Sequence, residues 1–178
     1  MKQNLFQLIL RQSYQSLPPA LQHFHEPRLG HFEGKAFVKG DNGALAKLLR
    51  KLNGFPAPSS EEMPIVVKVV RSESEERWLR KFGETKFSSK MTRISGENVL
   101  SEDFGLFRFK FSLSFREDRI HWNLVGWSFV GIPMPDALGP TITAWEGVNA
   151  DGNYHFASSV KFPLAGVLVD YAGWLDCK

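Results

Sequence analysis

The sequence predicts a mainly β or α+β domain, in which a strongly curved antiparallel sheet, or a barrel-like sheet, carries N-terminal helices on one face or at one end. Helical patterns occupy the beginning of the chain, and almost everything after Pro64 reads as strand. The chain is rich in aromatic residues, with 15 Phe, 5 Trp and 3 Tyr, which favour strands and fill a core well. So many consecutive strands must curl, split into layers or close on themselves.

Length and composition fit a single domain, residues 1–178, with a helical part at 1–58 and an antiparallel β part at 59–178. Lys and Arg total 22 and Asp and Glu total 19, and the interspersed charges form no basic patch for nucleic acid. No stretch has the ~20 consecutive apolar residues of a transmembrane segment, and the N-terminus lacks a signal-peptide cleavage site. We therefore expect a cytoplasmic protein.

The helical part begins with an amphipathic helix at residues 4–15, whose apolar face includes Leu5 and Ile9. Pro18 ends this helix, because proline removes a backbone donor and disfavours helix in the residue before it. Pro19 then suits the first position of a second, short helical turn.

The clearest helix follows a strand predicted at 31–39. Either Asp41 or Asn42 is expected to cap it, and Gly54 to end it in the left-handed conformation. The spacing of four leucines predicts a buried stripe: Leu45, Leu48, Leu49 and Leu52.

Further strands are predicted at 65–71, 77–82, 86–94, 106–115, 120–130, 141–148 and 154–162, with a last strand or an irregular segment at 164–175. The alternation is sharpest at 106–115, where apolar side chains face one way (Phe107, Phe109, Phe111, Leu113 and Phe115) and polar ones the other (Arg108, Lys110, Ser112 and Ser114). This period of two is typical of a half-buried strand. Turns are predicted at 72–75, Gly83, Gly96, Glu117–Asp118 and Asp151–Gly152.

Sequence signatures of catalysis, cofactors and metals are missing. The scattered glycines form neither a dinucleotide fingerprint nor a phosphate-binding loop, so no cofactor is expected. No serine lies in a Gly-x-Ser-x-Gly elbow, and Cys177, next to the chain end, is expected to be an incidental free thiol. No metal site is predicted, since His23, His25 and His31 lack a completing ligand cluster and are expected to be exposed or capping.

Acidic residues cluster at predicted turns, where carboxylates are usually solvated: Glu97, Glu102, Asp103, Glu117 and Asp118. Their spacing gives no support to a pair that works as general acid and base. The sequence therefore favours a protein that is not an enzyme.

Aromatic side chains supply the first candidates for a ligand site. Phe107, Phe109 and Phe111, with Trp122 and Tyr154 on neighbouring strands, fit the lining of an apolar pocket. A packed core without a cavity fits the same pattern.

Two arginines and one loop complete the candidates. Arg80 shares a strand face with Trp78, so it can stack on the ring or meet an anionic ligand group; an exposed cation–π ladder fits the same spacing. Arg108 is a second cation for an acidic head group. Trp127 begins an apolar Gly/Pro loop at 126–135, which fits a binding site or a strand end that plugs the core.

Several motifs together resemble a known family. They are Leu17-Pro18-Pro19-Ala20-Leu21-x-x-Phe24-His25, Leu45-Ala46-x-Leu48-Leu49 with Gly54-Phe55-Pro56, Arg77-Trp78-x-Arg80-x-Phe82-Gly83-x-x-x-Phe87-Ser88-Ser89, Gly126-Trp127 with Gly131-Ile132-Pro133-x-Pro135, and Tyr171-x-Gly173-Trp174-Leu175. As a set they cover nearly the whole chain and resemble a bacterial family of domains of unknown function, number 4166. The resemblance implies no activity and no catalytic residues. It implies a stand-alone domain, or one that works beside a Rossmann-type, saccharopine-dehydrogenase-like domain.

Three functional hypotheses follow. The first is a non-enzymatic domain that encloses a small apolar or amphipathic ligand, with Arg80 or Arg108 at any acidic head group. The second is an enzyme, or an accessory domain acting with a separate Rossmann-type oxidoreductase; a buried polar cluster with His121 or His155 near a carboxylate would favour it. The third is a protein–protein interaction module that docks through an exposed loop around Trp127.

Overall fold

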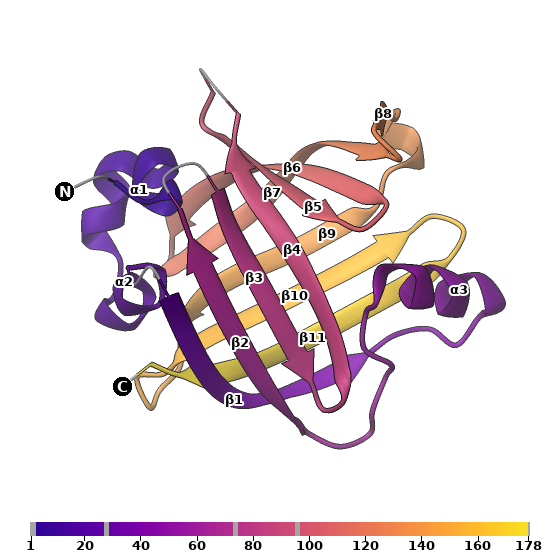
Figure 1. The fold of residues 1–178 in the computed structure, drawn as a ribbon, viewed down its shortest axis with the longest axis horizontal. Helices are drawn as coiled ribbons and strands as arrows, with labels where there is room; N and C mark the ends of the chain where they lie inside the picture. The colour runs from indigo at the N-terminus through magenta and orange to yellow at the C-terminus, as the bar shows by residue number, and fades with distance from the viewer. Residues whose placement is uncertain (1–2, 27–28, 73–74, 95–96, 178) are drawn as a thin grey trace.

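The computed structural model describes residues 3–26, 29–72, 75–94 and 97–177. Within these ranges, ten antiparallel strands close into a barrel (Figure 1). They are β1 (Leu29–Lys39), β2 (Met63–Arg71), β3 (Glu75–Phe82), β4 (Thr85–Arg93), β5 (Val99–Phe104), β6 (Phe107–Arg116), β7 (Arg119–Phe129), β9 (Thr141–Val148), β10 (Tyr154–Phe162) and β11 (Gly166–Asp176). The expected turn residues Glu73, Ser74 and Gly96 lie outside the described residues.

The barrel closes by simple up-and-down connections. Strands β1 to β7 pair in sequence order, β7 pairs with β9, and β11 returns to pair with β1. The short strand β8 (Ile132–Pro133) adds to β7 outside this ring. The last closing contact is short, since β7 and β9 pair only where Ile120–Trp122 meets Ala144–Glu146. The prediction of a curved or barrel-like antiparallel sheet is confirmed.

Because the strands alternate in direction, their connections lie at two opposite ends of the barrel. We call the end that carries the N-terminal helices the N-terminal end; it lies on the left of Figure 1, with both chain termini. The opposite end, on the right, carries helix α3 (Ala44–Asn53), and we call it the α3 end. The turns β3–β4, β5–β6, β7–β8 and β10–β11 also lie at the α3 end.

The N-terminal end is covered by α1 (Leu5–Leu10), the 3-10 helix η1 (Arg11–Ser16) and α2 (Pro19–His25). The single helix expected at 4–15 is wrong in its continuity, since Arg11 has a φ of 53° and the α-helix ends there. Pro19 occupies the first position of α2, as expected. The helices insert aromatic side chains into the barrel end: Phe6, Phe24 and His25 are all fully buried.

Helix α3 turns a different face to the barrel from the one predicted. Leu45, Leu48 and Leu52 are 43%, 53% and 54% exposed, and of the predicted stripe only Leu49 is half-buried against the core. The buried residues of α3 are Ala46, Arg50 and Asn53.

The reason for this orientation is the Arg50 guanidinium. It donates hydrogen bonds to the carbonyl oxygens of Leu168 (2.9 Å) and Asp41 (2.8 Å), which satisfies acceptors at the start of β11 and before the helix. The expected cap is also wrong, because Gly43 is the N-cap and the Asp41 carboxylate accepts from the Val167 amide instead. Gly54, with a φ of 68°, ends the helix as predicted.

Most strands follow their predicted ranges, and β6 has the predicted inward Phe107, Phe109 and Phe111. The tail expected as a strand or an irregular segment is the strand β11. Strand β5 was not predicted, because its polar residues read as a solvated turn. Its polar Glu102 is 4% exposed and lies inside the barrel, so the expectation of a solvated carboxylate is wrong.

Candidate functional site

The inward faces of the strands surround a cavity in which the centre of a water-sized sphere can move through about 80 Å³. All the space between the lining atoms, including the part open to solvent, amounts to about 800 Å³. Phe24 of α2 lines it at the N-terminal end and Phe55, just after α3, lines it at the opposite end. Four of the described lining residues are polar and non-aromatic: Arg80, Glu102, Glu146 and Ser158. The cavity therefore combines an apolar, aromatic wall with a few fixed polar groups, the usual makeup of a small-molecule site.

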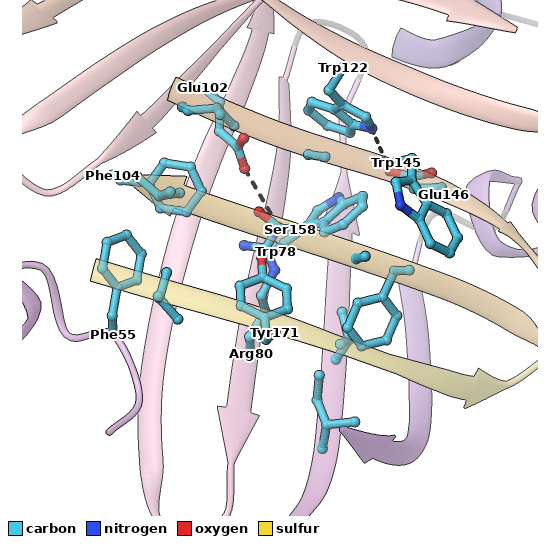
Figure 2. Close-up of a pocket in the computed structure, with 18 of the residues that line it drawn as sticks. Phe55, Trp78, Arg80, Glu102, Phe104, Trp122, Trp145, Glu146, Ser158 and Tyr171 are labelled. Carbon is cyan, nitrogen blue, oxygen red and sulfur yellow. Dashed lines mark hydrogen bonds and ion pairs between the residues drawn. The ribbon is translucent and has the colours of Figure 1, made fainter. Parts of the chain in front are cut away.

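Arg80 and Glu102 form the first polar group. Arg80 Nη2 lies 3.5 Å from Glu102 Oε1, and Arg80 Nη1 donates to Ser89 Oγ at 2.9 Å. The guanidinium also lies 4.6 Å from the Trp78 ring centroid. Figure 2 shows Glu102 pointing from the wall toward Arg80 and Ser158. Arg80 is thus held from several sides before any ligand arrives.

Glu102 is an ionisable group in an unfavourable place. Burial raises the pKa of its carboxyl, and the nearby Arg80 charge opposes that rise. At 3.5 Å the Arg80 contact is an ion pair without hydrogen-bond geometry, and Glu102 Oε1 has no hydrogen-bond partner among the described residues. This oxygen of a cavity-lining residue can therefore still accept a hydrogen bond from a ligand.

Glu146 is the centre of the second polar group. Its Oε2 lies 2.7 Å from His25 Nε2, and its Oε1 accepts from the Trp122 indole N–H at 3.0 Å, which Figure 2 marks with a dashed line. His25 and Glu146 are 121 positions apart in sequence, so this contact also fastens α2 to the barrel wall. His25 is 0% exposed, and the expectation of an exposed or capping histidine is wrong.

Tyr154 lies beside the second group. Its ring stacks on Phe24 with centroids 4.0 Å apart. Burial, followed by the charge of Glu146, raises its pKa well above the usual value, so the phenol keeps its proton. Its hydroxyl is buried and lies close to the Glu146 carboxylate, but it makes no hydrogen bond of good geometry within the described residues. A buried hydroxyl without such a bond is uncommon in a folded protein.

Six of the nine residues predicted to contact a ligand line this one cavity: Trp78, Arg80, Phe109, Phe111, Trp122 and Tyr154. Three lie elsewhere. Phe107 is buried next to Phe129 and Phe162, and the exposed Arg108 pairs with Asp103 on the outer face.

Trp127, the third, is 7% exposed, and its indole N–H donates to the Pro135 carbonyl at 3.1 Å. Its ring packs on Phe162. The side chain therefore plugs the core at the α3 end, and the interaction module with an exposed Trp127 is not the arrangement found.

Sequence reasoning missed Glu102, Glu146 and His25. The alternation of β9 could have placed Glu146 on the inner face, but no local signal identifies its partner. The histidines that were considered beside a carboxylate, His121 and His155, do not line the cavity.

In the described ranges, no three His, Cys, Asp or Glu side chains gather closely enough to hold a metal ion. None of the described helices combines the length and apolar character that crossing a membrane requires.

Comparison with models of known protein families gives a match. A family model described as "Domain of unknown function (DUF4166)" matches residues 17–175. No curated protein matches the chain. The matched segment contains α2, α3 and the ten strands of the barrel, apart from Asp176 at the end of β11.

Proposed function

The chain belongs to this family of domains of unknown function, and we propose that it binds a small, mainly apolar ligand with one polar group inside the barrel. Aromatic and aliphatic side chains form most of the cavity lining. An apolar ligand that enters such a space removes its own apolar surface from water, which is the main source of affinity.

The observation that carries this proposal is a pair of poorly satisfied polar atoms in the cavity wall. Within the described residues, neither Glu102 Oε1 nor the Tyr154 hydroxyl makes a hydrogen bond of good geometry, although Arg80 lies beside the first and Glu146 beside the second. Both residues line the cavity. Leaving a buried polar group unpaired costs about 1–3 kcal/mol. A ligand hydroxyl that donates to Glu102, or a ligand oxygen that accepts from Tyr154, would recover part of this cost.

The size of the cavity limits the ligand. A space of about 80 Å³ holds several water molecules or one small organic molecule. The polar groups that face it include both a cation and carboxylates, and Arg80 already has Glu102 as its counter-ion. A neutral alcohol or carbonyl compound therefore fits better than a strongly charged one.

Native mass spectrometry of the purified protein, repeated after denaturing extraction, tests the proposal. We expect a mass excess that disappears on extraction, or uptake of an added small alcohol such as benzyl alcohol. Ala144→Leu should fill the cavity and abolish the excess, because Ala144 lines it. Thr143→Leu, on the exposed neighbouring position of β9, is the matched control and should keep it. A bare protein that takes up no small alcohol would contradict the proposal.

A second candidate is an enzyme that uses acid–base chemistry, favoured by the buried His25–Glu146 contact at 2.7 Å. Glu146 lines the cavity and is held by His25, so it is the candidate general base, and the adjacent Tyr154 phenol, which keeps its proton, is the candidate donor. The retained ligand from the first experiment would be the substrate. Its conversion to a new compound by the wild type, and its unchanged retention by Glu146→Gln, would support an enzyme; an unaltered ligand in both proteins would exclude one.

A further inference from the structure

Exposed large apolar side chains gather at the α3 end of the barrel. Leu45, Leu48 and Leu52 project from α3, Leu106 from the β5–β6 turn, Ile132 from β8 and Leu164 from the β10–β11 turn. Leu164 is 90% and Ile132 65% exposed. Figure 1 shows α3, β8 and the β10–β11 turn on this one side of the molecule. We call these six residues the apolar rim.

Helix α3 is amphipathic with its apolar stripe turned to solvent. Arg50 holds the polar side of the helix on the barrel through two carbonyl oxygens. The Arg50 contacts therefore orient the helix so that Leu45, Leu48 and Leu52 face solvent. Exposed apolar side chains that gather on one side of a molecule mark a contact site.

The charges beside the stripe identify the contact. At 100° per residue, Lys47 and Lys51 lie on the flank of the helix next to Leu48, both are exposed, and α3 contains no acidic residue. An apolar stripe flanked by lysines is the pattern of helices that lie in the interface of an anionic bilayer.

A strained turn keeps another apolar side chain at the same end. Val130 has a φ of 50° and is followed by Gly131 at 79°, and it is 61% exposed. A β-branched residue rarely adopts this conformation, and Asn is the usual residue at this position of a two-residue hairpin. The chain thus has an exposed valine where a polar residue would be less strained.

We propose that the α3 end docks on a membrane surface rich in anionic lipids. The six residues of the apolar rim insert between the upper parts of the acyl chains, and Lys47 and Lys51 contact the lipid phosphates. The rim consists of separate projections from α3 and three turns, which suits a fluid lipid surface better than a rigid partner with fixed complementary pockets. The docking does not depend on what the cavity binds.

Co-sedimentation with vesicles tests this surface. We expect the protein to bind vesicles made of an equal mixture of phosphatidylcholine and phosphatidylglycerol, and to bind vesicles of phosphatidylcholine alone only weakly. Salt should release it from the mixed vesicles. Leu48→Ser with Leu52→Ser should lower binding on the order of tenfold or more. Lys47→Glu with Lys51→Glu should remove the preference for phosphatidylglycerol.

The matched control is Leu79→Ser with Val125→Ser, which changes two exposed apolar residues in the barrel strands β3 and β7 and should leave vesicle binding unchanged. Absence of binding to either vesicle, or an equal loss in the control, would overturn the proposal. Size-exclusion chromatography of the same proteins completes the test. An oligomer that Leu48→Ser with Leu52→Ser dissociates would assign the rim to a second copy of the chain and would also overturn it.

Discussion

Arg80 and Glu102 meet inside the barrel, with 3.5 Å between Nη2 and Oε1. They come from β3 and β5, and Ser89 of the intervening strand β4 accepts a hydrogen bond from the same guanidinium. The two charges are 7% and 4% exposed. Arg80 depends less on this contact than Glu102 does, because Arg80 has further partners in Ser89 and the Trp78 ring.

We predict unequal effects when either member of the pair is replaced. Arg80→Met leaves a buried carboxylate without a counter-ion and should lower the free energy of unfolding by about 3–5 kcal/mol at neutral pH. Glu102→Gln removes a charge that burial disfavours, but it also leaves the buried Arg80 without its counter-ion. Because Arg80 keeps Ser89 and the Trp78 ring as partners, the loss should be smaller, about 1–3 kcal/mol. Urea unfolding measures both. Equal destabilisation by the two variants would show that the ionised carboxylate of Glu102 is the favoured form.

The same carboxyl predicts a pH dependence. Its pKa is raised above the unfolded value of 4.5, so the folded state holds the proton more tightly than the unfolded chain. The associated stability is fully present below pH 4.5 and is lost as the pH rises through the folded pKa. The free energy of unfolding of the wild type relative to Glu102→Gln should therefore be higher near pH 4 than near pH 7. A difference that increases with pH would contradict the raised pKa.

The inward face of β6 gives a third prediction. Phe109 is 2% exposed inside the barrel, so Phe109→Asp should abolish soluble expression, because it buries a charge without a partner and leaves a cavity. Lys110→Asp is the control on the same strand, since Lys110 is exposed; its effect should be within about 0.5 kcal/mol. Normal folding of Phe109→Asp would reverse the assigned orientation of the strand.

The barrel was predictable because its determinants are local. The alternation in β6, the Glu117–Asp118 turn and the Gly54 helix end each follow from a few adjacent residues. The orientation of α3 was not. Periodicity shows which residues share a helix face, but the direction of that face is set by the Arg50 contact with Leu168, 118 positions away.

The candidate site was predictable only in part, for the same reason. The aromatic lining and Arg80 follow from strand alternation, which places them on one face with a period of two. Glu102 lies in a strand whose polar residues resemble a turn, so its burial depends on closure of the whole sheet. The contact of His25 with Glu146 joins a helix to a distant strand, and no sequence spacing encodes it.

Tyr154 gives a fourth prediction, which separates folding from binding. Its buried hydroxyl makes no hydrogen bond of good geometry within the described residues and lies near the Glu146 carboxylate, so Tyr154→Phe removes a poorly satisfied group. The ligand-free variant should be as stable as the wild type or more stable by about 1 kcal/mol. If the ligand accepts from this hydroxyl, the variant should also retain less of it in native mass spectrometry. Marked destabilisation of the ligand-free variant would show that the hydroxyl has a partner in solution.

Cys177 gives the last prediction. Burial raises the pKa of its thiol from 9.0 to about 12, and alkylating reagents react with the thiolate. At a pH well below both pKa values, this rise of about three pKa units reduces the fraction of thiolate about a thousandfold. Iodoacetamide should therefore label the folded protein very slowly at neutral pH and the urea-unfolded protein readily. Because Cys177 directly follows β11, labelling that proceeds without urea would report local opening of this strand. Equal rates in folded and unfolded protein would show that the thiol is not buried, and that the end of β11 does not close the barrel against β1 as described.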